Sequence, residues 1–142
     1  MQSIVVDAGP MIAMFNRTDA HHKMALAFLQ RCDEVQLIST SLAVGEAAAL
    51  LSGQQHRLFD FLQWAETTLL VDDQFNEDLP RMIEIMKKCR DLPADLADVS
   101  LIALCERRGI ATVATIDSDF SVYRLPKGRK FENVFFDSAG GS

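Results

Sequence analysis

The sequence predicts an α/β domain in which helices cover both faces of a mostly parallel sheet. Short runs rich in β-branched and aliphatic residues alternate with longer segments of helical periodicity along the whole chain. Strands separated by helices need right-handed crossovers, which produce parallel strands. The length of 142 residues suits one domain with a single core.

In the N-terminal half, the expected strands cover residues 3–6 and 35–39, and the expected helices cover 9–15, 18–32, 41–53 and 55–66. Pro10 is tolerated in the first turn of its helix, where its missing N–H is not needed. Thr40 or Ser41 is a suitable cap for the alanine-rich third helix, which we expect to end near Gly53.

In the C-terminal half, the expected strands cover residues 67–71, 111–116 and 133–136, and the expected helices cover 77–90 and 95–108. Lys87, Lys88 and Arg90 favour the end of the first of these helices, because cations stabilise a helix C-terminus. Gly109 is expected to close the second. We expect one domain over residues 1–137 and a disordered tail over 138–142.

Composition narrows the function classes. The chain carries 20 acidic and 14 basic residues, a net charge of −6, which does not favour broad electrostatic binding of nucleic acid. No apolar run approaches the roughly 18 residues of a membrane helix. The chain starts on its first strand without a leader, which predicts a cytoplasmic protein. Cys32, Cys89 and Cys105 are expected to be reduced packing residues, because their spacing does not fit a metal site.

Four cations gather near the C-terminus, and two interpretations of them are open. They are Arg124, Lys127, Arg129 and Lys130. Such a cluster is typical either of a solvated turn or of a rim that contacts phosphates.

Acidic residues follow two of the most strongly apolar strands. Asp7 ends the strand at 3–6, and Asp117, with Asp119 two positions later, ends the strand at 111–116. In an open α/β sheet the functional site forms outside the carboxyl ends of the strands. We therefore expect these carboxylates to face one crevice.

Two further acids lie in otherwise apolar helical segments. Glu46 is the only charged residue between positions 35 and 56, and Asp98 lies in the segment ADLADVSLIALC. Asp95 is interpreted as the cap of that helix. The embedded acids lack matching basic residues in their segments, and a divalent cation would supply the counter-charge. Carboxylate oxygens without Cys or His favour Mg²⁺ or Mn²⁺ over zinc, and clustered carboxylates around Mg²⁺ are a recurrent device for phosphodiester hydrolysis.

At these residues the chain resembles the PIN-domain ribonucleases, and most closely the VapC-type toxins of bacterial toxin–antitoxin pairs. Four segments in order carry the resemblance: VVDAGPMIAMF, TSLAVGEAAALL, PADLADVSLIALCERRGI and VATIDSDFSVYR. The resemblance implies a three-layer α/β/α fold with a five-stranded parallel sheet and a Mg²⁺- or Mn²⁺-dependent endoribonuclease. It also implies a homodimer and a cognate antitoxin.

Carried onto this chain, the resemblance assigns roles to individual residues. The catalytic metal ligands would be Asp7, Glu46, Asp98 and Asp117, with Asp119, Thr115 and Ser118 as auxiliary residues. The chain departs from the family at Val99, where a small alanine is usual, and we expect only a packing adjustment there.

Other functions compete with this interpretation. An aspartyl-phosphate phosphotransferase needs a second acid two residues after Asp7, where this chain has Gly9. Two alternatives stay open: a housekeeping RNA-processing nuclease without an antitoxin, and a PIN-like module that binds nucleic acid without cutting it.

Overall fold

The fold is built on a five-stranded parallel sheet. The computed structural model describes residues 1–91, 95–117 and 123–136. Its strands are β1 (Gln2–Val6), β2 (Val35–Thr40), β3 (Leu69–Asp72), β4 (Thr112–Ala114) and β5 (Glu132–Asn133). They lie in the order β3-β2-β1-β4-β5, and every neighbouring pair is parallel. The expected parallel sheet is confirmed.

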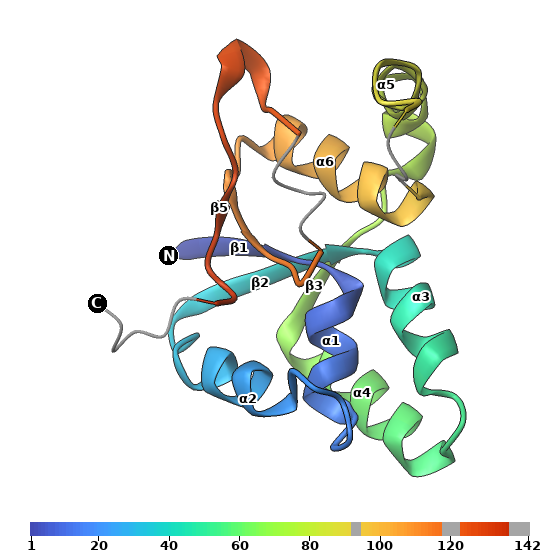
Figure 1. Cartoon of the computed structure of the whole chain (residues 1–142), viewed down its shortest axis with the longest axis vertical. Coiled ribbons are helices and arrows are strands. Elements are labelled where there is room, and N and C mark those ends of the chain that lie inside the picture. Colours follow the sequence, from blue (N-terminus) through green and yellow to red (C-terminus); the bar gives the residue numbers. More distant parts are fainter. Residues whose placement is uncertain (92–94, 118–122, 137–142) are drawn as a thin grey trace.

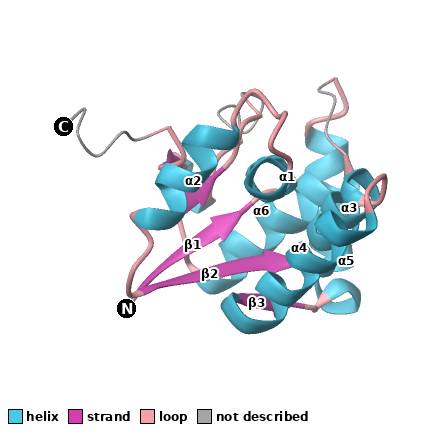
Figure 2. Cartoon of the chain, turned by 90° about the horizontal axis from the view of Figure 1, so that it is seen from below, coloured by secondary structure: helices cyan, strands magenta, loops and turns pink. Residues whose placement is uncertain are grey.

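Within the described residues, six α-helices complete a three-layer α/β/α arrangement. They are α1 (Ala8–Phe15), α2 (His22–Gln30), α3 (Ser41–Leu51), α4 (Gln55–Thr68), α5 (Phe75–Lys88) and α6 (Leu96–Arg108), followed by the short 3-10 helix η2 (Pro126–Gly128). Figure 1 shows α1, α2 and α4 on one side of the sheet and α5 and α6 on the other. Helix α3 contacts both α1 and α6, and Figure 2 shows β1, β2 and β3 side by side.

Burial of the central strands and of α6 forms the core. Val5 and Val6 of β1 are almost fully buried, as are Leu37 and Ile38 of β2. Nine successive residues of α6, from 97 to 105, are buried, because this helix lies between the sheet and α5. Val99 is among them and fills core space.

Several element boundaries differ from the sequence prediction for identifiable reasons. Thr67 and Thr68 belong to α4, and not to β3, and the Thr67 hydroxyl donates to the carbonyl of Gln63 one turn earlier. Helix α2 begins only at His22, because Asp19 accepts from the His21 N–H and holds the preceding segment in a turn. Strand β4 ends at Ala114, and β5 covers 132–133 where a strand over 133–136 was expected.

Other local predictions are confirmed. Gly109 adopts the left-handed conformation, with φ 69°, that ends α6. The three cysteines are free, and Cys105 is buried. No helix of the described part is long and apolar enough to cross a membrane. The expected tail at 138–142 lies outside the described residues.

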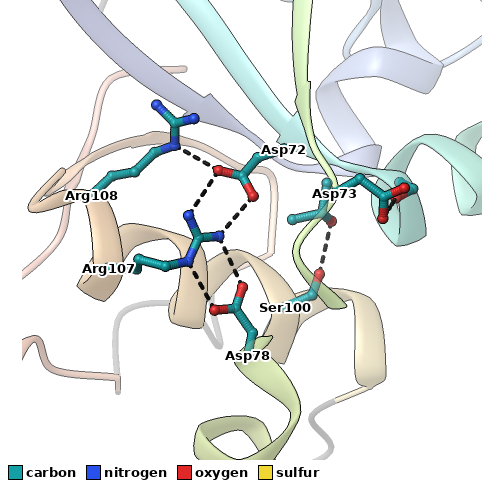
Figure 3. A network of polar contacts seen from close by, with 8 residues as sticks. Asp72, Asp73, Asp78, Ser100, Arg107 and Arg108 are labelled. Atoms are coloured by element: carbon teal, nitrogen blue, oxygen red, sulfur yellow. Dashed lines mark hydrogen bonds and ion pairs between the residues drawn. The ribbon is translucent and has the colours of Figure 1, made fainter. Parts of the chain in front are cut away.

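A buried carboxylate ties β3 to two helices. Asp72 is the last residue of β3, and its side chain is 1% exposed. Arg107 binds both of its oxygens, at 2.7 and 3.0 Å, and Arg108 adds a bond at 2.6 Å (Figure 3). Arg107 also bridges to Asp78 of α5 at 2.9 Å. Burial alone raises the pKa of Asp72, but the hydrogen bonds from the two arginines outweigh it and leave that pKa below its ordinary value.

Replacing Asp72 by Asn should destabilise the protein in a pH-dependent way. The variant removes the charge partner of Arg108 and one of the two partners of Arg107, which keeps Asp78, and we expect a loss of about 1–3 kcal/mol at neutral pH. Because the folded-state pKa of Asp72 is lowered, its contribution is present above about pH 4 and is lost as the pH falls through that lowered value. Urea unfolding of wild type and variant at pH 7 and pH 3 measures both effects.

The matched control is Glu84→Gln, which removes a carboxylate whose side chain is 66% exposed in its bridge to Arg81. We expect it to change the free energy of unfolding by less than about 0.5 kcal/mol. An Asp72→Asn variant as stable as this control at pH 7 would contradict the structural role given to Asp72.

Candidate active site

Asp7 lies at the carboxyl end of β1, where the chain turns into α1. Its residue is 6% exposed, and its backbone N–H still pairs with the carbonyl of Ala114 in β4 at 2.9 Å. One carboxylate oxygen accepts from the Ala8 N–H at 2.7 Å, and the other accepts from the Thr115 hydroxyl at 2.9 Å. Both oxygens are therefore oriented by neighbouring donors that carry no full charge.

Thr115 joins Asp7 to Asp117. It follows β4 and is 1% exposed. Its hydroxyl oxygen donates to Asp7 and accepts from the Asp117 N–H at 3.0 Å. Gly9 lies against this segment, where a Cβ would stand 3.4 Å from the side chain of Ile116, at ordinary contact distance. Because β1 and β4 are parallel neighbours, Asp7 and Asp117 both lie beyond the carboxyl ends of the strands.

Helix α3 places Glu46 near Asp7, at the carboxyl end of the sheet. Thr40 caps α3 by accepting from the Ala43 N–H, and its hydroxyl also hydrogen-bonds Ser100 of α6 at 2.8 Å. This side-chain bond fixes the start of α3 against α6. Glu46 is half-buried on the middle of α3.

The first turn of α6 supplies two more carboxylates. Asp95 is the cap that the sequence predicts, and its side chain accepts from the Asp98 N–H at 2.8 Å. Asp98 is 7% exposed. The capping bond orders the turn on which both carboxylates lie.

The acids lie close enough to disfavour one another's ionisation. Burial raises the pKa of Asp98 to about 8, and the charges of Asp7, Asp95, Asp117 and Glu46 add to this effect. Burial, followed by the charge and hydrogen bonding of Asp95 and the charge of Asp7, raises the pKa of Glu46 to about 7. The pKa of Asp7 is also raised by burial and by Asp117 and Asp95, although its bonds from Thr115 and Ala8 oppose the shift.

Three of these acids have no basic partner in the part of the chain that is described. Among those residues, no Lys or Arg forms an ion pair with Asp7, Glu46 or Asp98. Asp72 shows the contrast, because it is equally buried and has two arginines. No arginine or lysine of the described residues therefore neutralises Asp7, Glu46 or Asp98.

The carboxylates are neighbours without forming a closed coordination shell. Across residues 1–91, 95–117 and 123–136, no group of three or more His, Cys, Asp or Glu side chains is arranged to hold a metal ion. The contacts of two histidines lie outside the acidic cluster. The His22 ring hydrogen-bonds the carbonyl of Ala13 at 2.7 Å, and the His21 ring lies 3.7 Å from Asp19.

The four C-terminal cations lie on a separate hairpin. The backbone of Arg124 pairs with Lys130 in an antiparallel bridge, and Lys127 and Gly128 turn the chain with φ values of 66° and 75°. All four side chains are exposed, including that of Arg129. In Figure 1 the hairpin projects past the C-terminal end of α6.

Two expected auxiliary residues, Ser118 and Asp119, lie outside the described residues. Conversely, two residues near the acids were missed as site members by sequence reasoning. Asp95 was interpreted only as a helix cap, and its spacing of three from Asp98 was the available signal. Asn133 hydrogen-bonds the backbone of Thr115, and nothing local in the sequence indicates that contact.

Comparison with known proteins identifies the class. The family model of the PIN domain matches residues 4–125, so the chain belongs to the PIN domain family. A similar solved structure is Mycobacterium tuberculosis VapC20, described as a sarcin–ricin loop cleaving toxin. The TM-score is 0.76 with 20% sequence identity, and the match covers 83% of this chain and 92% of that chain. This likeness concerns the fold. No curated protein matches the sequence.

The metal-free protein should become less stable as the pH rises through the neutral range. The folded-state pKa values of Asp98 and Glu46, about 8 and about 7, exceed their ordinary values, so the folded state binds more protons than the unfolded state between about pH 4 and pH 8. The free energy of unfolding therefore falls as the pH rises through this window. Melting temperatures in EDTA at pH 5 to 8 measure the slope.

Asp98→Asn should flatten this slope, because the amide does not ionise. The exposed Asp60 of α4 provides the control, and Asp60→Asn should keep the wild-type slope. Parallel pH profiles for the wild type and Asp98→Asn would show that Asp98 is not held in its neutral form by the fold.

Proposed function

We propose that this protein is a metal-dependent endoribonuclease that hydrolyses RNA phosphodiester bonds and acts as the toxin of a toxin–antitoxin pair. The observation that supports it best is the pair of buried acids at the carboxyl end of β1 and the start of α6, Asp7 and Asp98, which form no ion pair with a Lys or Arg of the described residues. Membership of the PIN domain family and the fold likeness to an RNA-cleaving toxin support the same function.

The donor set fits a hard divalent cation. Asp7, Glu46, Asp98 and Asp117 offer only oxygen, which Mg²⁺ and Mn²⁺ prefer, and they carry the charge that such an ion would neutralise. Among the described residues no three of these side chains are arranged to hold an ion as they stand, so direct coordination requires side-chain movement. When bound, the ion lowers the pKa of a water nucleophile and stabilises charge on the leaving oxygen.

The protein's own residues prepare this site. Thr115 and the Ala8 N–H fix the two oxygens of Asp7, which limits the reorganisation needed on binding. Asp95 holds the turn that carries Asp98 and adds negative charge beside Glu46. Because the pKa values of Asp98 and Glu46 are raised, binding a cation releases protons near neutral pH.

Glu46→Gln and Asp7→Asn should each abolish divalent-dependent cleavage of RNA. Each change removes one negative charge and keeps the side-chain size, and we expect a loss of at least about 100-fold, comparable with removing groups that touch a catalytic metal. Cleavage of total RNA with Mg²⁺, Mn²⁺ or EDTA, followed by mapping of the cut ends, measures the effect.

The control is Glu66→Gln, an exposed glutamate on α4. Its activity should equal that of the wild type. Cleavage by the wild type in EDTA, or full activity of Asp7→Asn, would contradict a metal-dependent site. A wild type that binds RNA without cutting it would instead support the alternative of a binding module.

We also propose that the hairpin at 123–131 contacts the phosphates of the RNA. Among the described residues, Lys127, Arg129 and Lys130 form no ion pair, and Arg124 is exposed beside them. The chain is acidic overall, so such a local group of cations is where a polyanion meets the least repulsion.

Arg124→Ala combined with Lys127→Ala should weaken RNA binding and reduce its salt dependence. Each lost phosphate contact should reduce the slope of log K against log salt by about 0.7 for single-stranded RNA. Fluorescence anisotropy at several salt concentrations measures this slope. Lys87→Ala with Lys88→Ala on α5 is the charge-matched control, and an equal reduction there would remove the hairpin from the proposed interface.

The proposed partners are a second copy of the chain, a cognate antitoxin and RNA, in the cytoplasm. Exposed apolar side chains on α4 and the edge strand β3, such as Phe59, Leu62 and Leu70, support an association surface. Sedimentation of a monomer at all concentrations would contradict the homodimer. Growth arrest on expression, relieved by a co-encoded small protein, separates a toxin from a housekeeping nuclease.

A further inference from the structure

The side chain of Asn133 holds both backbone polar groups of Thr115. Asn133 is the last residue of β5. Its amide nitrogen donates to the Thr115 carbonyl at 3.0 Å, and its amide oxygen accepts from the Thr115 N–H at 3.2 Å. The same oxygen accepts from the Phe135 N–H at 3.1 Å. One side-chain amide therefore acts as a peptide group would in a strand.

These bonds replace the next backbone bond between β4 and β5. The N–H groups of Glu132 and Val134 donate to the carbonyls of Ala111 and Val113 at 2.9 and 2.8 Å. In a parallel pair, the same pattern would next join the Thr115 N–H to the Val134 carbonyl.

The Val134 carbonyl instead accepts from the guanidinium of Arg31 at 2.9 Å. Strand β4 ends at Ala114, and the Asn133 amide binds the backbone of Thr115, the next residue.

The turn held in this way supports the acidic cluster. The Thr115 hydroxyl has one hydrogen, which it donates to Asp7, and its oxygen accepts from the Asp117 N–H. Both bonds require the Thr115 backbone to stay in one position after the strand has ended. Asn133 provides that position from the edge of the sheet.

We propose that Asn133 is a positioning residue of the active site, which acts through Thr115 to orient Asp7 and the start of the Asp117 turn. The hydrogen-bond network stands on the contacts alone, whereas its effect on metal binding and cleavage rests on the proposed function. Asn133 is exposed on an edge strand, so replacing it leaves the core intact.

Asn133→Ala should raise the dissociation constant for Mn²⁺ by about 10- to 100-fold and lower kcat for RNA cleavage while changing KM little. Asn133→Asp keeps the shape of the side chain but replaces the donor to the Thr115 carbonyl with a second acceptor, so kcat should fall in this variant as well. The matched control is Glu132→Ala, an exposed neighbour in the same strand, which should equal the wild type. Calorimetry with Mn²⁺ and steady-state kinetics provide the two readings.

A purely structural role predicts a different result. In that case Asn133→Ala lowers the melting temperature but leaves the Mn²⁺ affinity and kcat of the folded protein equal to those of Glu132→Ala, which would overturn the proposal. Combining Asn133→Ala with Thr115→Val gives a second test. Because Asn133 acts through Thr115, the double variant should have the same Mn²⁺ dissociation constant and kcat as Thr115→Val alone. Additive losses in these two quantities would contradict the proposal.

One measurement is independent of metal and RNA. In the metal-free protein, Asn133→Ala should speed hydrogen exchange at the Asp117 amide, which donates to Thr115, and Glu132→Ala should not. Unchanged exchange at Asp117 would overturn the proposal. A wild type that neither binds Mn²⁺ nor cleaves RNA would contradict the proposed function, and the exchange rates would still decide the role of Asn133.

Discussion

Buried negative charge without a basic partner is the constraint on which the site depends. Asp7 and Asp98 are buried, and their pKa values are raised by burial and by the charges of neighbouring carboxylates. Asp72 is as buried, yet two arginines lower its pKa. The described part of the domain therefore contains one buried carboxylate that its own arginines neutralise and two, Asp7 and Asp98, that none of its arginines or lysines pairs with.

The scaffold holds this unfavourable cluster by neutral hydrogen bonds from several elements. Thr40 and Ser100 tie α3 to α6, Asp95 orders the first turn of α6, and Thr115 joins the ends of β1 and β4. Each bond orients a carboxylate or its helix without cancelling its charge. The fold that holds these acids together is stabilised by other parts of the domain, namely the buried strands and the arginine network at the end of β3.

Local sequence patterns predicted the strands, the helices and the positions of the acids, because these depend on periodicity, caps and strand ends. Asp95 was recognised as a cap, but its closeness to Glu46 depends on how α3 packs on α6. Asn133 binds the Thr115 backbone and Arg31 binds the Val134 carbonyl, in contacts between residues far apart in the chain. Such contacts are determined by tertiary packing, and no pattern within one segment indicates them.

The most direct test is a crystal structure of the protein soaked with Mn²⁺, read by anomalous scattering. We expect a peak bonded to carboxylate oxygens of Asp7 and Asp98, with Glu46 or Asp117 completing the shell, and its loss in Asp7→Asn crystals. A site without an anomalous peak, in crystals whose Mn²⁺ concentration supports full RNA cleavage in solution, would contradict the view that the buried acids await a cation.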